Sequence, residues 1–224
     1  MNENINLEVG NFYLLENGNI LGIEQDYDTT TGPRDWDHDS KFITFERDYD
    51  SPDENPFKTW DDMLKNFGVK WDEDKKRDMY SELAQLEEKA LTKGIVILPV
   101  WKYDHSGVSY KAAERNPFPD QRWDSGLAGV IYEKRDRRNI DQVKDMLKAE
   151  VNEYDQWQRG DVYRFTEYDK HGDYVDDLGG FYNTEDIKDN ISAKPIKDLG
   201  AHDDIANCLY ENRKELKELA DYER

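Results

Sequence analysis

The chain has 224 residues, of which 51 are Asp or Glu and 31 are Lys or Arg, so its formal net charge is −20. Hydrophobic residues make up 36% and charged residues 37%, so the chain is less apolar and more charged than an average globular domain. The composition predicts a folded acidic protein and argues against binding to DNA or anionic lipid through a basic surface.

The cysteine content and the lengths of the apolar runs indicate the cellular compartment. Cys208 is the single cysteine, which excludes an internal disulfide and a cysteine-based zinc site. Residues 1–10 are acidic and rich in Asn, unlike a secretory signal. No apolar run approaches the roughly 18 residues of a membrane span. We therefore expect a cytoplasmic protein that does not engage a membrane.

A β-hairpin and a further strand are predicted near the N-terminus. Residues 11–25 contain two apolar runs around Asn17-Gly18, a dipeptide that favours a tight hairpin turn. A polar loop over 26–40 follows. Residues 41–45 then alternate between polar and apolar side chains, as a half-buried strand does.

Two helices are predicted next. After a loop at 48–57, Thr59 is placed to cap a short helix with acidic residues in its first turn. A longer helix is predicted over 72–93, where apolar residues recur at three- and four-residue spacing, and Gly94 is placed to end it.

The second half alternates strands and helices. Residues 95–101 and 127–132 are apolar and rich in β-branched residues, which predicts buried strands. Residues 139–158 carry one apolar stripe and form the clearest helix. A hairpin is predicted over 161–182, and a last helix over 203–222.

Hairpins bracket the helices, and few strands are adjacent in βαβ order. This order favours an α+β fold with an antiparallel or mixed sheet and amphipathic helices on one side. We expect a single domain over residues 1–182, with 183–224 an appended polar segment whose C-terminal helix packs on it.

Six motifs follow one another between residues 25 and 182. They are 32–37 (GPRDWD), 98–107 (LPVWKYDHSG), 123–132 (WDSGLAGVIY), 150–157 (EVNEYDQW), 160–163 (GDVY) and 179–182 (GGFY). In order and spacing they resemble an uncharacterised protein family of bacteriophages and mobile elements of Gram-positive bacteria. The resemblance brings no catalytic residues with it. The acidic segment 48–74 and the tail after 183 look like additions to the family pattern.

Two polar corners are the candidates for chemistry. Asp104, His105 and Ser106 are adjacent, so on an extended chain His105 points away from the other two and the three cannot form a relay among themselves. A relay that includes Asp124 or Ser125 is compatible with the chain, and two carboxylates with an imidazole could hold a divalent cation. We favour a structural role for both corners: the first forms a turn, and the second leads into a buried strand. A pocket at these corners would be lined by Tyr103, Asp104, His105, Trp123, Asp124 and Ser125.

A calcium-loop spacing occurs at Asp35, Asp37, Asp39 and Glu46. The sixth position is Ser40 instead of the glycine that the sharp turn needs, and a strand follows where a helix is required. We therefore expect this segment to fix a loop with Trp36 inserted into the core. No metal and no cofactor are predicted.

The carboxylate excess is the remaining feature, and it also serves solubility. Duplex DNA carries one negative charge per ~1.7 Å of its axis, so an acidic protein can imitate it. With the phage-like resemblance, this favours an inhibitor of a host DNA-acting defence enzyme, a restriction or CRISPR nuclease, that occupies the enzyme's basic nucleic-acid channel without binding nucleic acid itself. The predicted contact residues are Asp48, Asp50, Asp53, Glu54, Asp72, Glu73 and Asp74.

Two other classes of function stay open. One is a small-ligand-binding protein or hydrolase-type enzyme with its pocket at the two corners. The other is an adaptor that binds a protein through exposed aromatic residues. A binding protein is favoured over an enzyme, because no nucleophile elbow or phosphate-binding loop is present in the sequence.

Overall fold

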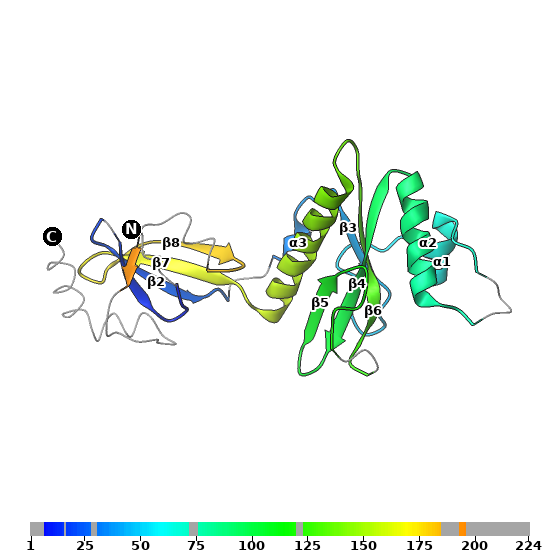
Figure 1. Ribbon diagram of the computed structural model, residues 1–224. Coiled ribbons are helices and arrows are strands. Elements are labelled where there is room, and N and C mark those ends of the chain that lie inside the picture. Colours follow the sequence, from blue (N-terminus) through cyan, green and yellow to red (C-terminus); the bar gives the residue numbers. More distant parts are fainter. Residues whose placement is uncertain are drawn as a thin grey trace. The chain divides into compact units, whose positions relative to one another are not determined.

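The chain divides into two compact units (Figure 1). The computed structural model describes residues 7–15, 17–27, 31–71, 76–119 and 123–184, and the backbone of 193–195. Residues 1–30 and 160–224 form one unit, here called the terminal unit, and residues 31–159 form the other, the central unit.

The terminal unit contains an antiparallel sheet with the strand order β8-β7-β2-β1-β9. Its strands are β1 (Phe12–Leu15), β2 (Ile20–Gln25), β7 (Tyr163–Tyr168), β8 (Tyr174–Phe181) and β9 (Ala193–Pro195). Both predicted hairpins are confirmed, because β1 pairs with β2 and β7 pairs with β8. Gly18 has φ 83° at the first turn, as a tight hairpin turn requires.

Apolar residues of four segments form the core of the terminal unit. Its buried members are Leu7, Tyr13, Leu15, Leu21 and Ile23, with Phe165 and Phe181 packed against them. These residues come from both ends of the chain. The terminal unit therefore needs residues on both sides of the central unit for its core.

The central unit is built on an antiparallel sheet with the strand order β3-β6-β4-β5. The strands are β3 (Lys41–Thr44), β4 (Ile95–Asp104), β5 (Val108–Ala112) and β6 (Ser125–Lys134). The helices are η1 (Pro33–Asp35), α1 (Trp60–Phe67), α2 (Met79–Thr92) and α3 (Ile140–Arg159). The structure confirms the α+β class.

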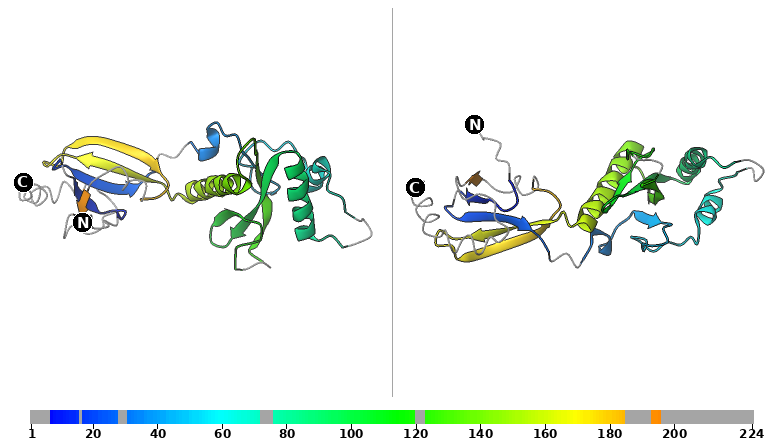
Figure 2. Two further views of the ribbon diagram at one scale, coloured as in Figure 1. Left: turned by 45° about the horizontal axis from the view of Figure 1, so that its top comes forward. Right: turned by 90° about the horizontal axis from the view of Figure 1, so that it is seen from below.

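Helices cover both faces of this sheet, which corrects the expectation of helices on one side (Figures 1 and 2). Phe42 of β3 packs in one cluster with Val143 and Leu147 of α3. The next residue, Ile43, packs in another cluster with residues of α1 and α2. Successive side chains of a strand point to opposite faces, so the continuous apolar runs of β3, β4 and β6 supply two cores at once.

Most boundaries of helices and strands follow local sequence signals. The Thr59 side chain accepts a hydrogen bond from the amide of Asp62 and caps α1, as predicted. Helix α2 begins at Met79 with Asp78 as its N-cap, so it is shorter than the predicted 72–93, and residues 72–75 lie outside the described part. Strand β5 was not predicted.

The domain division also differs from the expectation of a boundary at 182. The backbone of β9 pairs with β1, so part of the segment after 183 belongs to the same sheet as the N-terminal hairpin. The helix predicted over 203–222 lies outside the described residues. No helix in the described ranges is long and apolar enough to cross a membrane.

A buried arginine organises the loop at 31–40. The side chain of Arg34 is 4% exposed, and it pairs with Asp53 at 2.5 Å and with Glu150 at 2.6 Å. It also donates to the carbonyl and hydroxyl oxygens of Ser40. Trp36, by contrast, is 57% exposed, which corrects the expectation that it inserts into the core. The arginine, not the tryptophan, anchors this loop.

Candidate functional site

The acidic surplus is unevenly divided between the two units. Residues 1–30 and 160–224 contain 23 Asp and Glu and 9 Lys and Arg, whereas residues 31–159 contain 28 and 22. The terminal unit therefore has a formal charge of −14 and the central unit −6. The central unit is nearly balanced in charge although it is the longer one. Most of the electrostatic field of the molecule therefore originates in the terminal unit.

The acidic loop predicted as the contact surface is only partly available. Asp48, Asp50 and Glu54 are exposed, as expected. Asp53 has a structural position instead, since its carboxylate binds Arg34 and accepts a hydrogen bond from the amide of Phe42 at 2.6 Å. Asp72, Glu73 and Asp74 lie outside the described residues.

The β7–β8 hairpin presents carboxylates and large apolar side chains together. Along β8 the exposed residues include Tyr174 (60% exposed), Asp176 and Leu178 (56% exposed), and Asp173 precedes them at the turn. β8 is also the last strand at its side of the sheet in the described part of the chain. This strand offers charge and apolar area on one edge, a combination that the hairpin predicted over 161–182 did not indicate.

One carboxylate of the hairpin is held by its neighbours. Hydrogen bonds from Tyr174 and then Arg164 lower the pKa of Asp177. Arg164 also reaches Glu24 on the adjacent strand at 3.5 Å. Asp177 therefore stabilises the sheet, and Asp173 and Asp176 are the better candidates for contact with a partner.

The structure brings the two polar corners together. Tyr103 of β4 pairs with Ser125 of β6, and the amide of Asp104 donates to the carbonyl oxygen of Asp124 at 2.7 Å. His105 Nδ1 lies 3.0 Å from Asp124 Oδ2. The β4–β5 turn between Asp104 and Val108 places this imidazole, and Ser106 adopts φ 61° in that turn.

The remaining corner residues surround this pair without forming a triad. Ser125 Oγ accepts a hydrogen bond from Asn116 at 2.9 Å. Trp123 is 86% exposed. Tyr103 stacks on His105, with 5.9 Å between ring centroids. With Asp124 on Nδ1, the imidazole could exchange a proton at Nε2, so general acid–base chemistry is what the corner could perform.

Neither metal hypothesis receives support from the described residues, in which no group of three or more His, Cys, Asp and Glu is placed to hold a metal ion. Glu46 is engaged elsewhere, because it binds Lys102 at 2.5 Å and accepts a hydrogen bond from the Tyr110 hydroxyl at 2.7 Å. Burial, and then this bond to Glu46, raise the pKa of Tyr110. The last position of the calcium spacing is thus bound by two other side chains.

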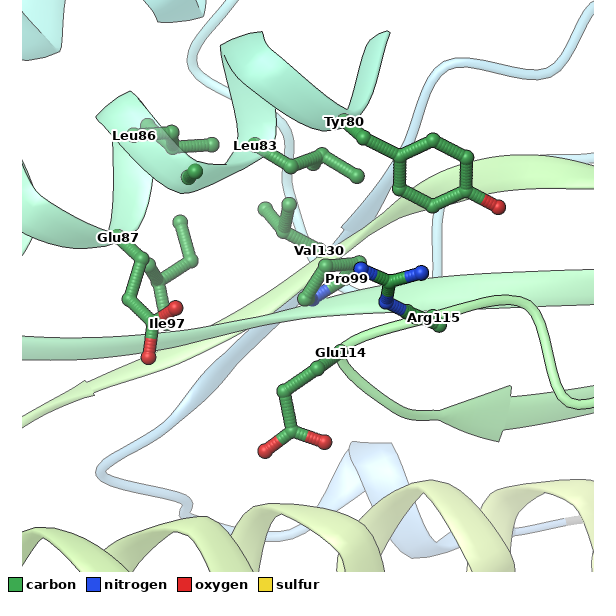
Figure 3. A pocket seen from close by; sticks show the side chains of 10 residues that line it. Tyr80, Leu83, Leu86, Glu87, Ile97, Pro99, Glu114, Arg115 and Val130 are labelled. Carbon is green, nitrogen blue, oxygen red and sulfur yellow. The ribbon is translucent and has the colours of Figure 1, made fainter.

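A cavity that the sequence did not indicate lies between α2 and the central sheet (Figure 3). Its volume is about 210 Å³. Its apolar lining consists of Leu83, Ala84, Leu86, Ile97, Pro99 and Val130, and its polar lining of Tyr80, Glu87, Glu114 and Arg115. Residues 114–115 follow β5, which was not predicted, so no local pattern could have brought them next to α2.

Comparisons with protein-family models, with curated proteins and with solved structures find no match for this chain. The resemblance to a bacteriophage family and the function drawn from it therefore stay predictions. What the molecule does has to be argued from its own charges and contacts.

Proposed function

We propose that the chain inhibits a host DNA-acting defence enzyme, a restriction or CRISPR nuclease, by occupying its basic nucleic-acid channel with the terminal unit. The single observation that carries the proposal is the concentration of charge, −14 of the −20, in residues 1–30 and 160–224. Fourteen charges correspond to about 24 Å of duplex axis at ~1.7 Å per charge. A channel that binds duplex DNA matches this amount of charge.

The exposed edge strand supports the same assignment. Electrostatic attraction steers a complex and sets its orientation, but apolar contacts supply much of its lifetime. Strand β8 carries Tyr174, Val175 and Leu178 exposed beside Asp173 and Asp176. This combination suits a protein channel better than a purely charged surface would. A defence enzyme is chosen as the partner because the six motifs resemble those of mobile-element proteins.

The test is competition with DNA on a panel of purified restriction endonucleases and CRISPR nucleases. The chain is expected to displace a labelled duplex from at least one enzyme, with an affinity that falls between 50 and 300 mM salt as screening increases. Asp173→Lys with Asp176→Lys should weaken inhibition on the order of tenfold or more. Fluorescence anisotropy of the duplex and cleavage of a plasmid measure the two effects.

A matched control separates local contact from total charge. Asp48→Lys with Asp50→Lys changes the charge by the same amount on the exposed loop of the central unit, and inhibition should stay within about threefold of the unmodified chain. If this control alone lost inhibition, the contact surface would be the loop with Asp48 and Asp50, as predicted from the sequence. No displacement from any enzyme would contradict the proposed function itself.

The second candidate is hydrolytic chemistry at the polar corner, favoured by the 3.0 Å contact between His105 and Asp124. An exposed imidazole held by a carboxylate can act on an activated ester. If the corner is reactive, hydrolysis of p-nitrophenyl acetate should drop to the buffer rate in His105→Gln. His171→Gln, which removes another exposed histidine, should leave the rate unchanged. Equal rates in both variants would exclude this candidate.

A further inference from the structure

The cavity between α2 and the central sheet has an apolar floor and, at its rim, one cationic side chain that has no anionic partner among the described residues. Leu83 and Leu86 of α2 face Ile97 and Pro99 of β4 across it (Figure 3). About seven water molecules would fill 210 Å³ at ~30 Å³ each. A space of this size, lined mostly by apolar side chains, favours a small organic molecule with an apolar body.

The two carboxylates of the lining are paired with one lysine. Lys144 of α3 binds Glu87 at 2.7 Å and Glu114 at 3.3 Å. A backbone hydrogen bond and the Lys144 ammonium lower the pKa of Glu114. The two glutamates therefore share one cation, Lys144, which offsets one of their two negative charges.

Arg115 is arranged differently. Its guanidinium lies over the ring of Tyr80, 5.8 Å from the centroid. In Figure 3 it extends toward Tyr80 and Pro99, while the carboxylate of Glu114 points away from it. Among the described residues Arg115 makes no ion pair and no side-chain hydrogen bond. Its donors stay open at the rim of an apolar cavity, and a guanidinium fork matches the two oxygens of a carboxylate.

We propose that this cavity binds a small organic acid, a monocyclic aromatic carboxylate, with its ring against Leu83, Pro99 and Val130 and its carboxylate on Arg115. The ring of Tyr80 closes the site beside the guanidinium. This ligand site belongs to the central unit and is independent of the partner surface proposed for the terminal unit.

The test compares phenylacetate with phenylacetamide, which has the same shape and no charge. In a ¹H–¹⁵N NMR titration of the full chain, phenylacetate should shift amides of α2 and of residues 113–116 and bind at least tenfold more tightly than the amide. Arg115→Gln should remove this preference and weaken phenylacetate binding about tenfold or more. Arg137→Gln, an exposed arginine outside the lining, should leave both affinities unchanged.

A second variant tests the cavity without disturbing the core. Ala84 is exposed on α2 and lines the cavity, so Ala84→Leu places apolar atoms into the space and keeps a good helix former in the helix. This variant should lose binding of both compounds while its spectrum stays that of the folded chain. Binding that persists in Ala84→Leu, equal affinity for acid and amide, or the absence of shifts at 10 mM phenylacetate would overturn the proposal.

Discussion

Arg34 illustrates what the motif residues do in the folded chain. It bonds Asp53, Glu150 and Ser40, and its side chain is 4% exposed. A buried charge is tolerated only when it is paired in this way. Gly32, in the same motif, lies so close to Trp157 that a Cβ atom would stand 2.9 Å from its ring. Motifs that resemble a family therefore serve, at these positions, to hold the fold together.

The same holds for the glycines of the last motif, 179–182. Asp26 accepts a hydrogen bond from the amide of Gly180 at 3.0 Å, and a Cβ atom on Gly179 would stand 2.1 Å from its carboxylate. A side chain at position 179 would therefore displace that carboxylate. Motif residues with such internal roles cannot reveal a partner.

Gly129 of β6 gives a sharp test of close packing between strands. A Cβ atom there would stand 2.0 Å from the carbonyl oxygen of Ile43 and 2.7 Å from the Cα of Thr44. These are backbone atoms, so β3 would have to move. Gly129→Ala is expected to lower the free energy of unfolding by about 1–3 kcal/mol, measured by urea denaturation.

Gly126 is the matched control on the same strand, because nothing lies within 4 Å of a Cβ atom built there. Gly126→Ala should change the free energy of unfolding by no more than about 0.5 kcal/mol. A loss of similar size in both variants would show that general strand propensity, and not the close approach of β3, explains the effect.

At the scale of elements, the two sheets differ in how their edges are covered. β5 forms one edge of the central sheet, and Asp155 of α3 accepts hydrogen bonds from the amide of Tyr110 at 2.6 Å and from the hydroxyl of Ser109 at 3.2 Å. The helix thus occupies a donor that another strand could use. β8 instead presents exposed residues along almost its whole length. Among the described residues no strand pairs with the outer side of β8, and such an edge is a place where partners bind, which agrees with the surface proposed above.

Hairpins, capped helices and the apolar strands were predictable because each rests on a local signal. Thr59 caps α1, and the run from Val96 to Leu98 lies in a strand, as their patterns indicate. The same run is apolar without alternation, a pattern that indicates a strand covered on both faces. The prediction of helices on one side of the sheet did not use this indication. β5 is short and mixed in polarity, so its sequence has no hydrophobic pattern that would predict a strand paired with β4.

The candidate sites were predictable only where their residues are close in sequence or lie on strands that pair with each other. His105 and Asp124 come together because β4 and β6 are paired strands, and the sequence had already placed both at strand ends. Asp53 was assigned to the surface from its acidity, although Arg34, nineteen residues away, holds it inside. The cavity at Arg115 depends on α2, β4 and a segment after β5, a combination set by tertiary packing alone.

At the scale of the whole molecule, the central unit is one continuous segment and the terminal unit is not. Among the described residues, the core clusters of the central unit draw only on residues between 42 and 154, and all four strands of its sheet lie within 31–159. β2, in contrast, pairs with β7 across the entire central segment. A chain folds independently when its own core is complete, so the central unit meets that condition by itself.

Residues 31–159 expressed alone are therefore expected to fold, with a cooperative urea transition and dispersed amide resonances. A fragment of residues 31–139 is the control, because it lacks Val143, Leu147 and Val151 of α3 and exposes one face of the sheet; it should unfold without a cooperative transition. Residues 1–30 alone should stay unfolded, since β2 has lost β7. If 31–159 showed no cooperative transition, the central unit would depend on the terminal segments for its stability. The fold would then be one cooperative structure in spite of its two units.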